Sequence, residues 1–274
     1  MKFLYHANCN DGHGAALAAW MKFGDDGHEY TPVQYGDHPP NITPGDTVFI
    51  LDFSYPREIL KDMASVAENI IVLDHHKTAR DDLIMPFDEQ NIITVFDMDK
   101  SGAVLAWERF HKDKPLPELF AYIQDRDLWR FDLDGTNEVS YGLSVFSDNF
   151  RHWAQLVNNP DLIQIRTRKD GRAIIRFLEI NAEKIINTPP VMFEITGDCV
   201  PVYNIPGFMI SDTLHMALEK HKEARYAVGY FDLPEGKRVY SLRSRNGTDV
   251  DVSEIARTHG GGGHKHAAGF SVKK

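Results

Sequence analysis

The feature that most constrains this chain is a set of apolar runs that each end in a histidine or an aspartate. Residues 70–73 are apolar, and Asp74, His75 and His76 follow them directly. A short apolar run of this kind predicts a buried strand, and open α/β sheets bind ligands at the carboxyl ends of their strands. The triplet alone leaves a second interpretation open, in which the polar side chains only bond to nearby backbone.

Three other apolar segments end in the same way. His6 and Asp11 follow residues 3–5, Asp52 follows residues 48–51, and Asp125 follows residues 119–124. Parallel strands would bring these ends to one edge of a sheet. Carboxylates and imidazoles in this mixture suit Mn, Mg, Co or Zn, and shared carboxylates suit a two-metal centre. The alternative is four unrelated acids in loops. Asp127 competes with Asp125 for the same role.

The first strand and the helix after it predict a pocket. Residues 2–5 form the expected strand, residues 12–23 the expected helix, and a polar loop from His6 to Gly12 joins them. Such a loop places side chains and helix N–H groups around one point. Ser101 and Gly102, before the helix expected from residue 104, could donate to a phosphate, and Ser101 could equally be an N-cap.

The chain is expected to contain two domains. A helical pattern over residues 162–186 ends at Asn187-Thr188-Pro189-Pro190, which is a strong stop signal. We therefore predict an α/β protein with a parallel-sheet domain over residues 1–187 and a smaller mixed α/β domain over residues 188–274.

A glycine-rich segment lies near the carboxyl end. Four glycines precede His264, and each loses much backbone entropy on folding. They suit a loop that offers N–H groups to phosphate oxygens. Arg243 and Arg245 could reach the same ligand, or they could be solvated surface residues. The expected substrate-binding residues are Ser101, Arg243, Gly261, Gly262, Gly263 and His264.

Composition limits the partners. The net charge of −10 argues against a broad basic surface for long duplex nucleic acid, although bound cations would still let an acidic site hold a small anion. No segment approaches the roughly 20 apolar residues that span a bilayer, and the two cysteines suit a reducing compartment. These observations predict a cytoplasmic protein without a membrane partner. They leave its oligomeric state, possible dimerisation included, undetermined.

The motifs resemble those of the DHH phosphoesterase family. Asp74-His75-His76 matches the motif that names it, and Gly261-Gly262-Gly263-His264 with Ala267-Ala268-Gly269 is similar to the signature of its DHH-associated second domain. The resemblance covers essentially the whole chain. The segments from His6 to Gly12 and from Asp125 to Trp129 are most similar to the nanoRNase B-like oligoribonuclease and cyclic-nucleotide phosphodiesterase branch.

The resemblance implies an active site in a cleft between the two domains, with two divalent ions, most naturally Mn²⁺, with Co²⁺ or Mg²⁺ as alternatives. It implies that His76 lies beside the substrate phosphate and that Asp74 orients an imidazole. Cys9 or Asn10 stands where the family often has a further aspartate, and a thiolate there would favour Co or Zn over Mg. The expected metal ligands are His6, Cys9, Asp11, Asp52, His75 and Asp125.

The expected function is hydrolysis of short single-stranded oligonucleotides by two-metal activation of water, with Asp74 and His76 as the expected catalytic residues. Small nucleotides are the alternative substrates, either 3′-phosphoadenosine 5′-phosphate or a cyclic dinucleotide. Inorganic pyrophosphatase activity is disfavoured by the glycine-rich ending. A nucleotide sensor without catalysis is the alternative from a different class, because the first motif is altered.

Overall fold

The computed structural model describes residues 1–146, 149–195, 197–234 and 236–273. The chain divides into two compact units, residues 1–175 and residues 176–274. The division lies inside helix α8 (Arg168–Asn187), and the predicted domain boundary after residue 187 falls at the end of the same helix. Each unit is described by itself.

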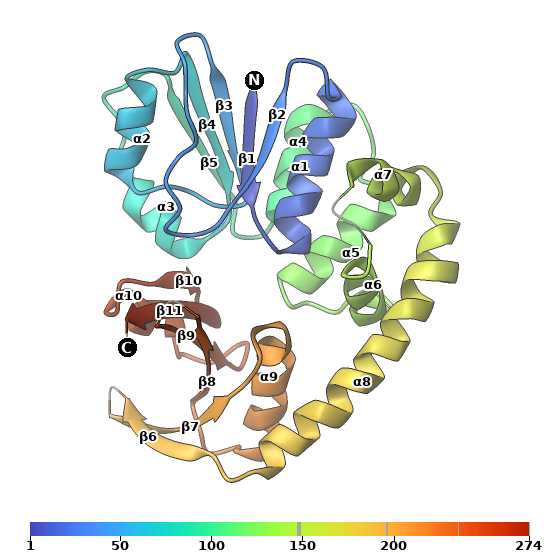
Figure 1. The fold of residues 1–274 in the computed structure, drawn as a ribbon, viewed down its shortest axis with the longest axis vertical. Coiled ribbons are helices and arrows are strands. Elements are labelled where there is room, and N and C mark those ends of the chain that lie inside the picture. Colours follow the sequence, from blue (N-terminus) through green and yellow to red (C-terminus); the bar gives the residue numbers. More distant parts are fainter. Residues whose placement is uncertain (147–148, 196, 235, 274) are drawn as a thin grey trace. The chain divides into compact units, whose positions relative to one another are not determined.

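The first unit contains a sheet of five parallel strands in the order β2-β1-β3-β4-β5 (Figure 1). Its strands are β1 (Lys2–His6), β2 (Glu29–Val33), β3 (Thr47–Leu51), β4 (Asn69–Asp74) and β5 (Ile92–Phe96). The central strands are buried almost throughout, as expected where helices cover both faces of a parallel sheet. The predicted parallel sheet is confirmed, and β2 is an additional strand.

Alternate residues of the strands enter two separate cores. Phe3, Phe49 and Leu73 pack on one face, whereas Leu4 and Val72 pack on the other. This alternation follows from the two-residue repeat of a strand. Helix α1 (Asn10–Phe23) and helix α4 (Gly102–Phe110) contribute to the first core, and α2 (Arg57–Ala64) contributes to the second. Helix α3 (Lys77–Leu83) follows β4.

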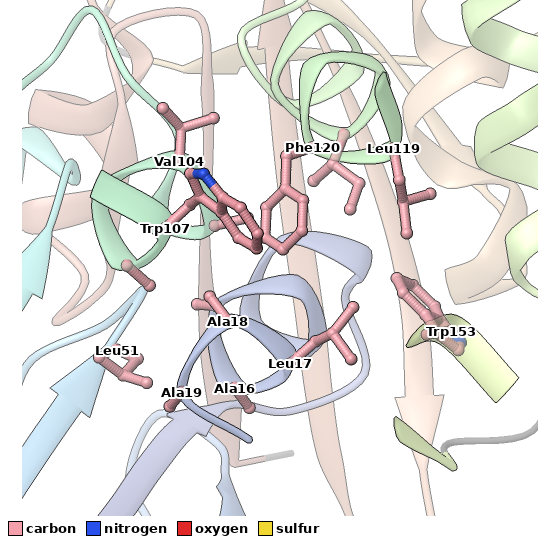
Figure 2. Close-up of a cluster of buried hydrophobic side chains, with 14 of the residues drawn as sticks. Ala16, Leu17, Ala18, Ala19, Leu51, Val104, Trp107, Leu119, Phe120 and Trp153 are labelled. Atoms are coloured by element: carbon pink, nitrogen blue, oxygen red, sulfur yellow. The ribbon is translucent and has the colours of Figure 1, made fainter. Parts of the chain in front are cut away.

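The first core depends on small residues in α1. Figure 2 shows Ala16, Leu17, Ala18 and Ala19 beneath Trp107 and the neighbouring aromatic ring of Phe120. A Cβ atom at Gly14 would lie 2.9 Å from Cβ of Ala103, so α1 and α4 approach as closely as the backbones allow. This close packing fixes the amino ends of both helices, which lie at the polar ends of the strands.

Further helices complete the first unit. They are α5 (Glu118–Asp127), α6 (Thr136–Leu143), α7 (Phe150–Asn158) and the π-helical turn η1 (Ile163–Thr167), which runs into α8. The sequence predicted a helix over residues 116–124. The observed helix begins after Pro117 and continues to Asp127, so Asp127 belongs to its last turn.

The second unit contains a mixed sheet of six strands in the order β10-β11-β9-β8-β7-β6. Only the β7–β8 pair is parallel among its described strand pairs. The strands are β6 (Val191–Ile195), β7 (Asp198–Asn204), β8 (Tyr226–Leu233), β9 (Lys237–Ser244), β10 (Gly262–His264) and β11 (Ala267–Lys273), and the helices are η2 (Gly207–Met209), α9 (Ile210–Lys220) and α10 (Val252–Arg257). Val200, Tyr226 and Leu242 lie at the centre of its core. The predicted α/β fold class, a parallel-sheet unit followed by a mixed one, is confirmed.

Helix α8 is the longest described helix, with 20 residues. Charged residues recur along it, and they include Asp170, Arg176, Glu179 and Lys184. Within the described parts of the chain, neither this helix nor any other has the length and apolar character needed to cross a bilayer.

Candidate metal centre

Four acidic or imidazole side chains meet where the strands of the first unit end. His75 follows β4, and its Nε2 lies 3.1 Å from Oδ1 of Asp52, 3.5 Å from Oδ2 of Asp11 and 3.4 Å from Oδ2 of Asp127. Asp11, Asp52 and His75 are each no more than 2% exposed. The structure therefore brings together three of the residues that the sequence predicted as metal ligands, and adds Asp127.

Asp52 lies between two groups of candidate ligands. Its Oδ2 is 3.6 Å from Nδ1 of His6 and 3.3 Å from Sγ of Cys9, on the side away from the contact with His75. Asp52 follows β3 and has a φ of +64°, which is uncommon for a residue other than glycine. Its backbone N–H donates to the carbonyl of Leu73 at 2.9 Å, which ties this turn to β4. These contacts place the Asp52 carboxylate where two cations could share it.

Asp11 is held by the amino end of α4. Its Oδ2 accepts a hydrogen bond from the N–H of Gly102 at 2.6 Å, and its Oδ1 accepts one from the N–H of Ala103 at 3.0 Å. The amino end of a helix favours a negative group. These bonds therefore hold the carboxylate in place, and they give two backbone N–H groups at the start of α4 a hydrogen-bond partner. A Cβ atom at Gly102 would lie 2.5 Å from Cβ of Asp52. The Gly102 position therefore brings α4, Asp11 and Asp52 together.

Asp74 positions His76 rather than His75. Its Oδ1 lies 2.7 Å from Nδ1 of His76 and also accepts from the backbone N–H groups of His75 and His76, at 2.7 and 3.2 Å. Asp74 is fully buried, and among the described residues its Oδ2 has no hydrogen-bond partner. The resemblance implied that Asp74 orients an imidazole, and the imidazole beside it in the structure is that of His76.

The structure distinguishes Asp127 from Asp125. The Asp125 carboxylate accepts from the N–H of Asp132 at 2.9 Å and of Leu133 at 3.1 Å, and from the hydroxyl of Thr136. These bonds fasten the loop after α5, and they occupy both oxygens of the residue that the sequence predicted as a ligand. Asp127 contacts His75 instead. Residues two apart lie on opposite faces of a helix, so only one of the pair can face the cluster.

The charges of this cluster interact strongly. Burial lowers the pKa of His75, but Asp127, Asp52 and Asp11 outweigh burial and raise that pKa well above its ordinary value. Burial raises the pKa of Asp52, but hydrogen bonds from His6 and His75 outweigh it and hold that pKa well below the ordinary value. Burial also raises the pKa of the Cys9 thiol well above its usual range, and nearby Asp52 and Asp11 act in the same direction. The carboxylates thus attract positive charge to one small volume.

The donor set fits divalent cations. Among the described residues of the first unit, Asp52 belongs to three groups of side chains that each have one candidate ligand atom within 4.8 Å of the others: His6, Cys9 and Asp52; Asp11, Asp52 and His75; and Asp52, Asp74 and His76. Two ligands of one ion, each about 2.1 Å from it at a right angle, are about 3 Å apart. The observed contacts of 3.1–3.6 Å around Asp52 come close to that spacing.

Other predicted site residues have structural partners. Ser101 is fully buried, and its hydroxyl accepts from the N–H of Val104 at 3.4 Å, so it is the N-cap of α4. Cys9 similarly caps α1 through a 3.1 Å contact with the N–H of Gly12. The role of Ser101 as an N-cap explains the position of its hydroxyl. Binding of substrate by Ser101 stays a prediction.

The second unit explains part of the glycine-rich segment without a ligand. Cβ atoms at Gly261 and Gly263 would run into backbone atoms of β11, so these glycines allow β10 and β11 to pack closely. Packing therefore accounts for the glycines at these two positions without a ligand. Gly262 and His264 form the rest of β10. Arg243 donates to the hydroxyl of Ser211 at 2.8 Å.

Arg245 is also engaged within the second unit. Its guanidinium donates to the backbone carbonyls of Ala224 at 2.7 Å and His221 at 3.2 Å. These bonds tie β9 to the turn after α9. Arg245 is therefore a half-buried residue that holds parts of this unit together.

Comparisons with known proteins identify the fold. No protein-family model matches the chain. The uncharacterized protein R106 of Acanthamoeba polyphaga mimivirus is 30% identical over 287 residues, which is 98% of this chain and 66% of that protein. The chain thus spans slightly less than two thirds of this relative's length.

Two solved structures share the architecture. The pGpG-specific phosphodiesterase PggH of Vibrio cholerae matches with a TM-score of 0.53 and 14% identity over 99% of this chain and 93% of its own. RecJ of Thermus thermophilus, in complex with Mn²⁺, matches with a TM-score of 0.50 and 15% identity over 99% of this chain and 49% of its own. The chain therefore shares the fold of these two proteins.

Proposed function

We propose that this chain is a metal-dependent phosphodiesterase that hydrolyses short oligonucleotides. The observation that carries the proposal is the position of Asp52, whose two oxygens lie against separate groups of candidate ligands. The nanoRNase B-like branch is part of the proposal and rests on sequence resemblance. The shared fold supports it, since one structure with this fold is named a phosphodiesterase and another is a complex with Mn²⁺.

The proposed arrangement uses Asp52 as the shared ligand. Asp11, His75 and Asp127 would hold one divalent cation with it, and His6 and Cys9 would hold the second. When bound, such cations lower the pKa of coordinated water and stabilise charge that develops on phosphate oxygens. Mn²⁺ is the expected ion, and the Cys9 thiol favours Co²⁺ or Zn²⁺ over Mg²⁺.

The protein itself positions an imidazole at this centre. Oδ1 of Asp74 lies 2.7 Å from Nδ1 of His76, and this contact holds the orientation of the imidazole ring. The opposite nitrogen, Nε2, is then the ring atom that can meet a substrate oxygen. We propose that His76 contacts the phosphate or the leaving oxygen, and that Asp74 acts only through His76.

Short substrates fit the charge of the chain. Long duplex nucleic acid requires many Lys and Arg contacts, which a chain of net charge −10 does not favour. A site neutralised by two cations needs few further positive groups to hold one or two phosphates. The name of PggH, a pGpG-specific phosphodiesterase, favours a dinucleotide as the second candidate substrate.

Hydrolysis of a 5′-labelled five-nucleotide RNA tests the proposal. The metal-stripped protein would be resupplied separately with Mn²⁺, Co²⁺, Mg²⁺ and Zn²⁺, alongside His75→Ala and the exposed control His38→Ala. We expect stepwise shortening that needs metal and His75 but not His38. Cleavage of pGpG without cleavage of the five-nucleotide RNA would assign the dinucleotide function. Failure on both substrates with every metal would overturn the proposed phosphodiesterase.

A further inference from the structure

We propose that Tyr35 is a substrate-positioning residue whose ring stacks on the nucleobase next to the phosphate at the metal centre. This inference rests on the proposed function and adds a determinant of specificity to it. Tyr35 follows β2, a strand that the sequence had not predicted, and its side chain lies beside the histidines at the strand ends.

The position of the ring is defined by three aromatic neighbours. Its centroid is 5.2 Å from that of His6 and 6.0 Å from that of His76, both in edge-to-face geometry. It is also 6.5 Å from the buried ring of Phe53, at an angle of 90°. Tyr35 thus lies beside a proposed metal ligand and beside the imidazole that is proposed to meet the phosphate.

The ring remains accessible in that position. Tyr35 is 55% exposed, although the histidine and aspartate side chains around it are mostly buried. Among the described residues its hydroxyl makes no hydrogen bond. An exposed aromatic ring is a sequence-tolerant surface for a base, since every base has a π-face. Inorganic phosphates and base-free sugars offer no such partner.

A rigid turn holds Tyr35 in place. The N–H of Asp37 donates to the carbonyl of Gln34 at 3.0 Å, and Gly36 has a φ of +94°, so residues 34–37 form a type II turn with Tyr35 at its first corner. The Asp37 carboxylate also accepts from the N–H of Gln34 at 2.9 Å. The turn is fastened beside the site, because the N–H of Ala7 donates to the carbonyl of Val33 at 2.9 Å. Little conformational freedom remains to be lost when a base stacks.

The test compares two substrates with two substitutions. The dinucleotide pApA and its analogue with abasic sugars would be offered to the wild type, Tyr35→Phe and Tyr35→Ala. Base-aromatic stacking predicts that Tyr35→Ala raises KM for pApA about 5- to 100-fold with kcat little changed, and that Tyr35→Phe retains the wild-type KM. The abasic analogue should show no difference among the three proteins. His38→Ala, an exposed change in the same loop, is the matched control.

Equilibrium binding separates this inference from the proposed chemistry. The dissociation constant of a non-hydrolysable analogue of pApA, measured by calorimetry on the same proteins loaded with Mn²⁺, should rise by a similar factor in Tyr35→Ala only. If the wild type binds pApA in this Tyr35-dependent way without cleaving it, the phosphodiesterase proposal fails and the stacking role stands. Equal effects of Tyr35→Ala on pApA and the abasic analogue, loss of binding in Tyr35→Phe, or no binding of pApA at all would overturn the stacking role.

Discussion

Oδ2 of Asp127 lies 3.4 Å from Nε2 of His75, whereas Asp125, two residues earlier in α5, directs its carboxylate to the backbone of the following loop. Helix α5 therefore places Asp127 at the candidate metal centre, whereas its Asp125 holds the loop that follows the helix. The two residues should respond differently to the same chemical change.

Replacing each acid by its amide separates these roles. We expect Asp127→Asn to lower kcat at least about 100-fold with little loss of stability, because it removes a charge beside His75. Asp125→Asn places an amide among three donors, and loss of these charge-assisted bonds should lower the free energy of unfolding by about 1.5–3 kcal/mol. Urea unfolding and Mn²⁺-dependent hydrolysis measured on both variants check this. Greater loss of turnover in Asp125→Asn would favour the ligand predicted from sequence.

The contact between Gly102 and Asp52 gives a prediction about packing. A methyl group at Gly102 would lie 2.5 Å from Cβ of Asp52, so Gly102→Ala should displace Asp52 or the α4 turn that holds Asp11. A displacement of about 1 Å should cost about 100-fold in turnover. Gly27→Ala is the control, since Gly27 has a φ of +73° and open space around it. It should cost only backbone strain of about 1–2 kcal/mol and leave turnover unchanged. Equal turnover of the two variants would contradict the packing argument.

Cys9 should influence the choice of metal. Its Sγ lies 3.6 Å from Nδ1 of His6 and 3.3 Å from Oδ2 of Asp52, which places a soft donor in one of the proposed sites. We expect Cys9→Ser to decrease the activity with Zn²⁺ and Co²⁺ relative to that with Mn²⁺ and Mg²⁺. The ratios would be measured against Cys199→Ser, which changes an exposed cysteine in the second unit. An unchanged metal order in Cys9→Ser would indicate that Cys9 only caps α1.

Stability should depend on pH through His111, far along the chain from the proposed ligands. Burial lowers the pKa of His111; its hydrogen bond to the carbonyl of Ala18 acts in the opposite direction, and Lys114 and Lys22 lower the pKa further. The unfolded histidine has a pKa of about 6.5. Between the folded and unfolded values the unfolded state binds more protons, so the contribution of His111 to the free energy of unfolding should fall as pH decreases through about 6.5 and level off below the folded pKa.

Urea unfolding at a series of pH values checks this sign. The difference in free energy of unfolding between the wild type and His111→Gln should decrease between about pH 7 and pH 5. Other titrating groups cancel in this difference, and they include His266 in the second unit, whose pKa is also lowered by burial. A steeper decrease in His111→Gln than in the wild type would show that the sign is wrong.

The sequence predicted the parts of the fold that depend on continuous apolar runs. Strands β1, β3 and β4 are buried on both faces, so their composition alone marks them. Strand β2 is mostly exposed or half-buried and contains Pro32, so it lacks that signal. The proposed role of Tyr35, two residues after the end of β2, rests on neighbours that only the structure reveals.

The position of a candidate ligand was predictable where it ends or follows a strand and less so elsewhere. His6, Asp52 and His75 lie at the candidate metal centre because the end of an apolar run fixes their position. Asp127 was only one of two candidates, because the choice depends on where α5 ends. The glycines before His264 suggested a ligand. At Gly261 and Gly263, however, the lack of a side chain lets the segment at the start of β10 pack against β11, a contact that no local sequence pattern reveals.

The most direct test of the central claim is the number of Mn²⁺ ions that the chain binds. Calorimetric titration of metal-stripped protein should give two sites in the wild type, and Asp52→Asn should weaken both because Asp52 contacts both ligand groups. His38→Ala should match the wild type. Two sites of unchanged affinity in Asp52→Asn, or no Mn²⁺ binding by the wild type, would contradict a two-metal centre organised around Asp52.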